Sequence, residues 1–377
     1  MMENCCVIGP VKSGTTLMIS LMDSHPELSL FPLEVKFFTH WVERLSSRGC
    51  TYKDLNHFFL KQSKIRFMNA EKSQETDIMN SGRINFAGFD FRLFVRLMEQ
   101  KSQIPENAES HGSELFRRYM SDLHKALSGV ISEEKKGWII SKEGNHGAKH
   151  ISKINHLFPR TRFVVLCRDP RDIYSSFKAI ARRKMEGVNS PSFKSIVSPC
   201  RYVHENKDKN ISAYEDLFVE FGGDGDFLFV RYESLVNNVR KEMTRVADFL
   251  NIQFDEILTR PTNLGNTWGG NSSIMTGFQA VQSERIGKWE TELTPPERRL
   301  FEYFFRRYLG QWGYAIKEEK TPKAKIVTAA VKTELEALLP FNVRVGSVRV
   351  IKNIVKSIRL LILVVVYILV SPDRLGR

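Results

Sequence analysis

The sequence predicts an α/β protein built on a doubly wound parallel sheet. Three observations lead to this fold class. Short apolar runs of the kind found in buried parallel strands alternate along the chain with segments of helical periodicity. The first run ends in a turn rich in Gly, Pro and Ser that leads directly into a helical pattern. Polar side chains stand just after several of the runs, at the sheet edge where doubly wound proteins bind ligands.

The first strand and the turn after it are the most informative stretch, Cys5-Cys6-Val7-Ile8-Gly9-Pro10-Val11-Lys12-Ser13-Gly14-Thr15-Thr16. Such a junction points several backbone N–H groups at one place, where the dipole of the following helix also favours an anion. Lys12 adds a positive charge. Hydroxyl donors come from Ser13, Thr15 and Thr16. The stretch therefore predicts a P-loop-like site for a phosphate group.

The position of the lysine separates this loop from that of nucleotide kinases. Gly9 and Gly14 have the separation of a Walker A loop, but Thr15 stands where that motif requires lysine. Lys12 lies two residues before Gly14 instead. A P-loop kinase is therefore the less favoured alternative.

Length and charge limit the remaining possibilities. With 377 residues, 42% of them apolar, and 26 Phe, the chain is long enough for one large α/β domain with additions, or for two modest domains. Residues 320–377 hold 11 Lys and Arg against 3 Asp and Glu, which is most of the formal charge of +13. This concentration favours an acidic surface such as anionic lipid as a partner and argues against a nucleic-acid groove.

The cysteines indicate a reducing location. Their number is odd, and three of the five lie in apolar strand-like runs, so we expect buried, reduced thiols. No CxxC or Cys/His metal spacing occurs, and no metal site is expected. The first strand begins almost at the N-terminus, without room for a signal peptide. We therefore expect a cytoplasmic protein.

A long helical segment is expected early in the chain. Residues 41–135 carry stripes of Phe and Leu at helical spacing, with breaks near 71–77 and 103–113. We expect this insertion to form a helical cap around the substrate. The alternative is a packing layer that does not contact substrate.

Four further strands are expected after the first, at Leu28–Phe31, Trp138–Ser141, Arg162–Cys167 and Phe227–Val230. Helices are expected after Gly147, from Pro170, from Glu233 to Leu250, and from Thr294 to about Tyr308, with a loop over residues 255–290. The side chains that stand just after expected strands, and so gather at one edge, are Lys12, Lys142, Arg168 and Tyr232.

A second motif follows the third of these later strands: Arg168-Asp169-Pro170-Arg171-Asp172-Ile173-Tyr174-Ser175-Ser176. Together with Lys12-Ser13-Gly14-Thr15-Thr16 it resembles the sulfotransferases that use 3′-phosphoadenosine 5′-phosphosulfate (PAPS). In that family the first motif holds the 5′-phosphosulfate. An arginine after a strand and a serine eight residues later hold the 3′-phosphate, and Arg168 and Ser176 match that spacing. A guanidinium can bond one phosphate through two N–H groups. The alternative is a helix start with surface ion pairs.

The resemblance also suggests the catalytic residues. The stretch Leu33-Glu34-Val35-Lys36-Phe37-Phe38 resembles the segment of glycan sulfotransferases whose glutamate deprotonates the acceptor hydroxyl, and tyrosylprotein sulfotransferases place a glutamate at a similar distance. Leu33 and Lys36 depart from the glycan pattern. Glu34 is therefore the expected base, with Glu143 and His146 as alternatives. Lys142 stands where the family has a lysine that reaches the sulfuryl group.

Two later stretches complete the implied nucleotide site. Tyr232 matches a family tyrosine near the adenine, and could equally be a core residue. The run Arg285-Ile286-Gly287-Lys288-Trp289 resembles the Gly-x-Trp element that closes over the nucleotide, although the Arg-Lys-Gly run of cytosolic members is absent. The candidate closing residues are Ser283, Arg285, Gly287 and Lys288.

These assignments imply a PAPS-dependent sulfotransferase without a metal. We expect positioning and charge stabilisation to dominate, by analogy with phosphoryl transfer. The expected acceptor is a hydroxyl of a saccharide or glycolipid. The alternative of another class is an inactive nucleotide-binding protein of the same fold.

Residues 317–377 differ in composition from the domain expected over residues 1–316. An apolar helical stripe, formed by Val350, Ile351, Ile354, Val355 and Ile358, has Arg349, Lys352, Lys356 and Arg359 largely off it. The uncharged run from Leu360 to Val370 would reach only about 16 Å as a helix, against about 30 Å for a bilayer core. We expect a peripheral membrane-surface anchor. The alternatives are an oligomer contact or a strap across the domain's own surface.

Overall fold

The structure is a computed structural model, in which two compact units are distinguished by their internal contacts. Unit 1 comprises residues 1–167 and 221–283, and unit 2 comprises residues 168–220 and 284–377. The structure describes residues 3–31, 34–45, 53–62, 90–100, 112–126, 137–144, 147–187, 198–207, 210–268, 281, 283–317, 321–338 and 348–371.

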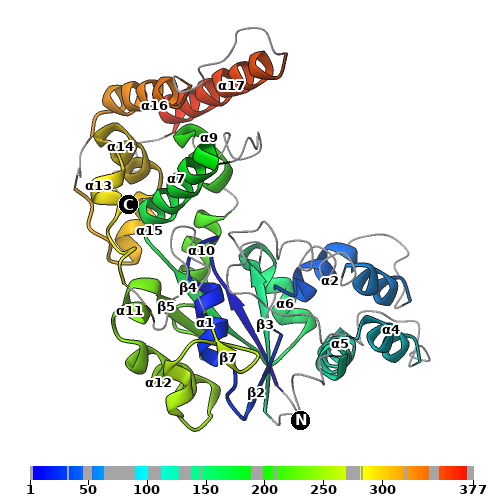
Figure 1. The fold of residues 1–377 in the computed structure, drawn as a ribbon. Coiled ribbons are helices and arrows are strands. Elements are labelled where there is room, and N and C mark those ends of the chain that lie inside the picture. Colours follow the sequence, from blue (N-terminus) through cyan, green and yellow to red (C-terminus); the bar gives the residue numbers. More distant parts are fainter. Residues whose placement is uncertain are drawn as a thin grey trace. The chain divides into compact units, whose positions relative to one another are not determined.

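Unit 1 is organised around a five-stranded parallel sheet, which confirms the predicted fold class (Figure 1). Its strands are β1 (Glu3–Ile8), β2 (Leu28–Leu30), β3 (Trp138–Gly144), β4 (Thr161–Cys167) and β5 (Phe227–Arg231), in the order β2-β3-β1-β4-β5. The chain crosses from β1 outward to β2 and later from β3 to β4, on the other side of β1. The direction of winding therefore reverses between β1 and β4, where doubly wound proteins bind ligands.

The centre of the sheet is almost completely buried. Cys5, Cys6 and Val7 on β1 and the run Phe163–Cys167 on β4 have no exposed surface. Burial raises the pKa of the Cys5 thiol to about 12, and it also raises the pKa of Cys6. These cysteines are free thiols that pack as small apolar side chains, as the sequence predicted.

Helices cover the sheet and extend unit 1. They are α1 (Thr15–Met22), α2 (Phe37–Leu45), α4 (Phe91–Gln100), α5 (Gly112–Ala126), α6 (Ile151–Leu157), α11 (Tyr232–Asn237) and α12 (Val239–Leu250). A helical stretch also covers residues 53–62. Shorter elements are η3 (Gly147–His150), η5 (Glu256–Thr259) and the hairpin β6 (Thr262–Asn263) and β7 (Asn266–Thr267). Helix α1 packs on β1 and β3, and α12 packs on β5.

The described helices of the 41–135 insertion share a core of stacked aromatic rings. Phe37 stacks on Phe59 with ring centroids 4.2 Å apart, and it also contacts Phe116 at 4.9 Å. Phe38 meets Phe158 of α6 edge to face at 4.5 Å. Such pairs add directional attraction to the burial of their area. The insertion is therefore fixed to α2 and α6 by packing, and its role as a cap stays a prediction. The expected breaks near 71–77 and 103–113 lie largely outside the described residues.

Unit 2 is helical. Its elements are α7 (Pro170–Gly187), α9 (Pro199–Lys207), α10 (Ile211–Phe221), α13 (Trp289–Glu292), α14 (Pro295–Phe304), α15 (Arg306–Gln311), α16 (Lys323–Leu338) and α17 (Val348–Val370), with the last residue of α10 counted in unit 1. Thr294 caps α14 as predicted. Its hydroxyl accepts from Glu297 N, while the Glu297 carboxylate accepts from Thr294 N at 2.8 Å.

The C-terminal tail forms two helices that pack within unit 2. Helix α16 contacts α14 and α9, and α17 contacts α16 and α9. At the end of α17 the Lys323 ammonium donates to Ser371 O at 2.7 Å. Among the helices described, none combines the length and apolar character needed to cross a bilayer.

Element boundaries differ from the sequence prediction in two places that bear on the site. Strand β3 continues to Gly144, so Lys142 lies inside the strand and not after it. The helix expected over Glu233–Leu250 is interrupted at Asn238, whose ψ of 70° is not helical. The Asn238 side chain accepts from Lys241 N at 3.2 Å and caps α12, so a second helix begins there.

Candidate active site

The loop between β1 and α1 has the backbone geometry of an anion cradle. Gly14, the N-cap residue of α1, has φ of 100°, and Lys12 has φ of 67°. The Ser13 N–H donates to Pro10 O at 3.0 Å, which closes the turn. A Cβ on Gly9 would lie 2.8 Å from Leu166 O of β4, so only glycine allows this approach. The loop thus leaves β1 in a tight turn and enters α1 at its N-terminus.

Ser13 fits the bound phosphate that this geometry favours. It is fully buried, and among the residues that the structure describes its Oγ finds no hydrogen-bond partner. Leaving a buried hydroxyl unsatisfied costs free energy. Gly14 has no side chain to cap α1, and Thr15 and Thr16 begin the helix. A phosphate oxygen at the N-terminus of α1 would satisfy these donors.

Tyr232 lies directly against this loop. It is the first residue of α11, and a Cβ added to Gly14 would come within 2.5 Å of its Cδ2 atom. The ring is half-buried. The structure therefore brings together Gly14 and Tyr232, two of the predicted cofactor-binding residues.

A second group of predicted residues meets at the first turn of α1. The Lys142 ammonium of β3 donates to Thr16 Oγ1 at 2.8 Å. The Glu34 carboxylate lies 3.6 Å from the Lys36 ammonium. Desolvation lowers the pKa of Lys142, Glu34 raises it by attraction, and Lys36 lowers it by repulsion. The charges of Glu34 and Lys36 therefore lie close enough to Lys142, at the carboxyl end of β3, to interact with it electrostatically.

The backbone of this segment is held by β3. Val35 N donates to Lys142 O at 3.0 Å. Lys36 has φ of 54°, a left-handed conformation that is uncommon for a residue with a side chain. Such local strain persists when surrounding contacts enforce it, and it is frequent at functional sites. Glu34 therefore stands on a segment whose position is fixed by the strand that carries Lys142.

Glu143, one of the alternative bases, has a structural role. Its carboxylate is buried and accepts from Phe37 N at 3.0 Å and Thr39 N at 3.2 Å. It thereby satisfies N-terminal donors of α2. Both oxygens are engaged in this cap. His146, the other alternative, lies outside the described residues.

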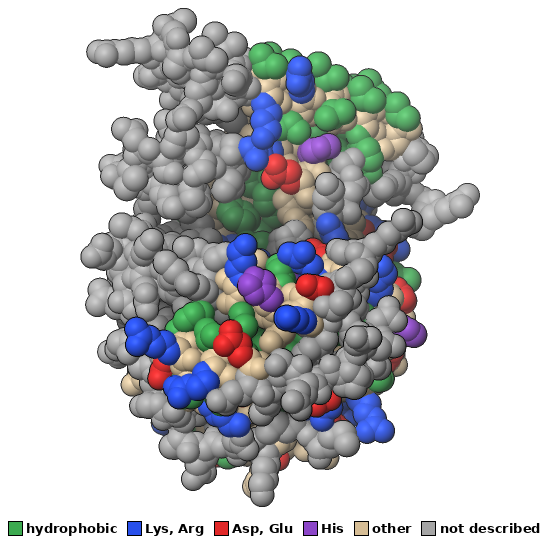
Figure 2. All heavy atoms as spheres, turned by 90° about the vertical axis from the view of Figure 1, so that its right-hand side faces the viewer, with side chains coloured by type: hydrophobic (Ala, Val, Ile, Leu, Met, Phe, Trp, Pro, Cys, Tyr) green, Lys and Arg blue, Asp and Glu red, His purple; other side chains and the backbone are tan. Residues whose placement is uncertain are grey.

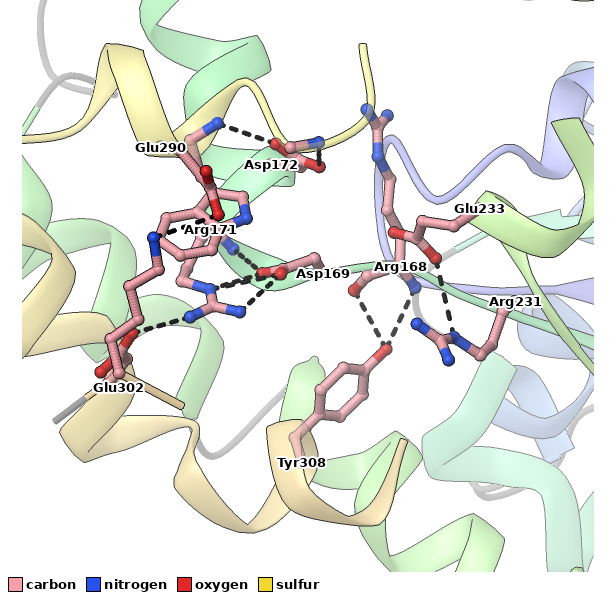
Figure 3. A network of polar contacts seen from close by, with 12 residues as sticks. Arg168, Asp169, Arg171, Asp172, Arg231, Glu233, Glu290, Glu302 and Tyr308 are labelled. Atoms are coloured by element: carbon pink, nitrogen blue, oxygen red, sulfur yellow. Dashed lines mark hydrogen bonds and ion pairs between the residues drawn. The ribbon is translucent and has the colours of Figure 1, made fainter. Parts of the chain in front are cut away.

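In unit 2, Arg168 follows β4 directly and is buried (Figure 3). Its N–H donates to the Tyr308 hydroxyl, which donates in turn to Arg168 O, both at 3.3 Å. Its guanidinium donates to Arg285 O at 3.0 Å. The Ser176 hydroxyl, two turns into α7, donates to Asp172 O at 2.9 Å. Arg168 is thus braced by Tyr308 and linked to the predicted closing segment.

The closing segment is held onto the start of α7 by Asp172. The carboxylate accepts from Gly287 N at 2.7 Å and from Trp289 N at 2.9 Å. Gly287 has φ of 69°, which glycine adopts without strain. Arg285 pairs with Glu292 at 3.0 Å, and Lys288 and Ser283 are exposed. Arg285 and Gly287 therefore lie with Arg168 in one local network.

A buried charge network underlies this segment (Figure 3). The Arg171 guanidinium donates to Asp169 at 2.7 Å and to Glu302 at 2.7 Å. Its face also stacks on the Trp289 ring, 3.7 Å from the centroid. In the sequence, Arg171 and Asp172 belonged only to the alternative interpretation of surface ion pairs at a helix start, whereas both side chains are buried. Asp169 is a local partner of Arg171. The other partners, Glu302 and Trp289 for Arg171 and the N–H groups of Gly287 and Trp289 for Asp172, lie more than a hundred residues away.

Most of the predicted site residues fall into two groups, one in unit 1 and one in unit 2. Unit 1 holds the loop residues with Tyr232, and Lys142 with Glu34. Unit 2 holds Arg168, just before α7, and Ser176 within α7, with Arg285 bonded to Arg168 and Gly287 bonded to Asp172. Among the described residues, no group of three or more His, Cys, Asp or Glu could hold a metal ion.

A family model and several solved structures are similar to this chain. The family model described as "Sulfotransferase family" matches residues 5–256. No curated protein matches the chain. Among solved structures, the sulfotransferase domain of the curacin biosynthetic pathway is 16% identical, with a TM-score of 0.45, and the match covers 84% of this chain and 99% of that one.

Two further structures are similar to a lesser degree. A sulfotransferase from Mycobacterium avium is 14% identical, with a TM-score of 0.41 over 84% of this chain and 78% of that one. A retinol dehydratase in complex with retinol and PAP is 17% identical, with a TM-score of 0.36 over 82% of each chain. The family match begins within β1, at Cys5, and extends past β5 and α12, so it includes residues of all five strands of the parallel sheet. The chain belongs to the sulfotransferase family and is a PAPS-dependent sulfotransferase.

Proposed function

We propose that this sulfotransferase acts on a hydroxyl of a saccharide or glycolipid, with Glu34 as the general base. The observation that supports Glu34 is its place beside Lys142, whose ammonium donates to Thr16 at the N-terminus of α1. The base and the lysine expected at the sulfuryl group thus share one local field. PAPS, when bound, supplies the sulfuryl group, and adenosine 3′,5′-bisphosphate is the leaving product.

Glu34 has the properties that proton abstraction needs. Its carboxylate is about two-thirds buried, so an acceptor hydroxyl can still reach it. The Lys36 ammonium lies 3.6 Å from the carboxylate and forms an ion pair with it. In the proposed step the acceptor O–H bond breaks as its proton passes to Glu34, and the oxygen becomes the nucleophile.

The phosphate loop holds the 5′ end of the co-substrate in this proposal. Lys12 and Lys142 contribute positive charge near the leaving oxygen. Backbone N–H groups at Gly14, Thr15 and Thr16, with the Ser13 hydroxyl, bind the phosphate oxygens. Tyr232, packed on Gly14, provides a ring for the adenine side.

The 3′-phosphate is assigned to Arg168 and Ser176. The Arg168 backbone is held by the Tyr308 hydroxyl, and its buried guanidinium is oriented by the bond to Arg285 O. Little side-chain entropy is therefore lost when the guanidinium bonds a phosphate. The Ser176 hydroxyl can turn from its own helix to a ligand. Arg285, Gly287, Lys288 and Ser283 are proposed as the closing residues.

The Glu34→Gln variant tests the base. We expect kcat for sulfate transfer from labelled PAPS to fall by about 10²–10⁴-fold, as is typical for loss of a general base. The dissociation constant for adenosine 3′,5′-bisphosphate, measured by isothermal titration, should change less than about twofold, because Glu34 is not assigned to the nucleotide. Assays use a glycolipid, a free oligosaccharide and a lipophilic alcohol as acceptors.

Glu43→Gln is the matched control, since Glu43 is an exposed glutamate on the neighbouring helix α2. It should leave transfer unchanged. Full activity of Glu34→Gln would reject the proposed base. Transfer to the lipophilic alcohol alone would reject the saccharide or glycolipid assignment, while leaving the sulfotransferase activity intact.

The Arg168→Ala variant tests the 3′-phosphate site. A hydrogen bond to a charged group contributes about 1.5–3 kcal/mol, so bisphosphate affinity should fall by about 10- to 100-fold. Affinity for adenosine 5′-phosphate, which lacks the 3′ group, should fall far less. Isothermal titration of both nucleotides measures the ratio.

Arg307→Ala serves as control, because Arg307 is an exposed arginine on α15. Thermal unfolding of both variants checks that they fold. An equal loss for the two nucleotides in Arg168→Ala would mean that Arg168 supports the fold and does not read the 3′-phosphate.

A further inference from the structure

Helix α17 has one face packed against the protein and the opposite face open to solvent. On the packed face Val364 and Ile368 are buried, and Tyr367 stacks on Phe304 of α14 with ring centroids 5.4 Å apart. The open face carries seven aliphatic side chains that are each 42 to 77% exposed. They are Val355, Ile358, Ile362, Leu363, Val366, Leu369 and Val370. We refer to these seven residues as the apolar face.

The apolar face is continuous along the helix. Ile358, Ile362 and Val366 follow one another at intervals of four residues, which keeps them on one side of an α-helix. From Val355 to Val370 the helix rises by about 22 Å. Isolated apolar side chains on a surface are normal, but a contiguous aliphatic stripe of this length indicates an interaction site.

Charge is distributed to suit an anionic partner. Lys356 and Arg359 are exposed on α17. Helical spacing puts Lys356 at the edge of the apolar face and Arg359 within it, one turn before Ile362 and Leu363. No Asp or Glu occurs in the sequence between Glu336 and Asp373. In Figure 2, hydrophobic side chains gather with Lys and Arg side chains over the part of the surface that α16 and α17 occupy in Figure 1. An apolar stripe next to basic residues, with no nearby acid on the helix, is typical of a helix that lies in a membrane interface.

We propose that the apolar face of α17 docks the protein onto the surface of an anionic bilayer. The helix lies in the plane of the interface, because its other face is occupied by α9, α14 and α16 and cannot face lipid. Aliphatic side chains enter the acyl boundary, while Lys356 and Arg359 meet the headgroup phosphates. A second copy of the chain fits less well, since two α17 helices would bring basic side chains together without an acid to pair with them. This inference is independent of the acceptor and of Glu34.

Vesicle flotation of the full chain tests the proposal. The probes are vesicles of phosphatidylcholine alone and of phosphatidylcholine with about 30% phosphatidylserine. The wild-type chain should float with the anionic vesicles, and the bound fraction should fall at high salt. Ile362→Glu combined with Val366→Glu should lower vesicle affinity by at least about tenfold, since both changes place a charge where acyl chains would lie.

Two further variants sharpen the result. Val219→Glu, on α10 of the same unit, changes a valine that is 64% exposed outside the apolar face, and it should bind vesicles as the wild type does. Lys356→Gln with Arg359→Gln should reduce the preference for anionic over neutral vesicles. Thermal unfolding and bisphosphate affinity of every variant should match the wild type, because the changed side chains are exposed.

Three outcomes would overturn the proposal. One is a wild-type chain that floats with neither vesicle. Another is vesicle binding that Ile362→Glu with Val366→Glu leaves unchanged. The third is a wild-type dimer, seen by light scattering without lipid, that the same double variant converts to monomer, which would assign the apolar face to a second copy. None of these results bears on sulfate transfer, which is measured separately.

Discussion

Asp172 is a buried carboxylate that accepts two backbone N–H groups, from Gly287 and Trp289. Desolvation raises its pKa from 3.8 to about 6, although both hydrogen bonds and the nearby Arg168 oppose the shift and Asp169 adds to it. A raised pKa means that the folded chain holds this proton up to a higher pH than the unfolded chain does. Burial of the Asp172 carboxylate is therefore unfavourable in itself, and its two backbone hydrogen bonds hold the closing segment.

The sign of the pH dependence follows from this shift. Between about pH 4 and pH 6 the folded chain binds a proton at Asp172 that the unfolded chain has lost, so the free energy of unfolding falls as pH rises. A shift of about 2 pKa units corresponds to about 3 kcal/mol. Asp172→Asn carries no titrating group at this position. We expect the unfolding free energy of the wild type, minus that of Asp172→Asn, to fall by about 3 kcal/mol between pH 4 and pH 7, measured by urea unfolding.

Taking the difference between the two proteins cancels the other titrating groups, which they share. A difference that stays constant with pH would show that Asp172 keeps an ordinary pKa. A difference that grows with pH would mean that the bonds to Gly287 and Trp289 outweigh desolvation, with the opposite sign of shift.

At the scale of elements, the sequence predicted best where local pattern and burial agree. Strands β1 and β4 are short apolar runs, and both were located within two residues because buried parallel strands have no polar face to confuse the pattern. The capping of α14 by Thr294 was also predicted, since a capping box is local in sequence.

Elements that depend on distant partners were not predicted. Strand β3 continues through Lys142, Glu143 and Gly144, three residues with low strand propensity, because Val7 and Ile8 of β1 pair with this stretch. The Glu143 carboxylate caps α2, which begins more than a hundred residues earlier. In the sequence, Glu143 is simply a polar residue after an apolar run, and a catalytic and a capping glutamate are indistinguishable there.

At the scale of the whole molecule, the parts of the candidate site that are contiguous in sequence were predicted, and those assembled from distant residues were not. The phosphate loop and the Arg168 motif are each one stretch of chain, so both could be proposed from the resemblance of short motifs to those of the family. The closing segment was located by its Gly and Trp, but the way it is held, through Asp172, Arg171 and the backbone of Arg285, required the fold. A side chain whose role depends on tertiary contacts with distant residues shows no periodic pattern in the sequence.

In the C-terminal tail, too, some features could be predicted from the sequence and others required the fold. Composition identified the basic, aliphatic character of residues 348–370, and helical spacing identified an amphipathic stripe. Which side of α17 faces the protein depends on its packing against α9 and α16, and that orientation defines the apolar face.

The buried thiols can be used to measure how the folded protein opens in solution. Cys5, Cys6 and Cys167 lie in the sheet of unit 1, and Cys200 is buried in unit 2, where its thiol bonds to Ala330 O. Burial raises the pKa of Cys5, Cys6 and Cys200, so at neutral pH these groups are protonated as well as inaccessible. Only a thiolate attacks an alkylating reagent readily.

The rate at which these cysteines are alkylated therefore reports on opening of the fold. In the native protein we expect each described thiol to react many-fold more slowly than in urea, with mass spectrometry of proteolytic peptides recording every site separately. Because the sites divide between the two units, unequal rates would reveal which unit opens first. Rapid native labelling of Cys5 or Cys6 would contradict a closed sheet core. The cysteines thus supply built-in, site-resolved probes of stability without any engineered label.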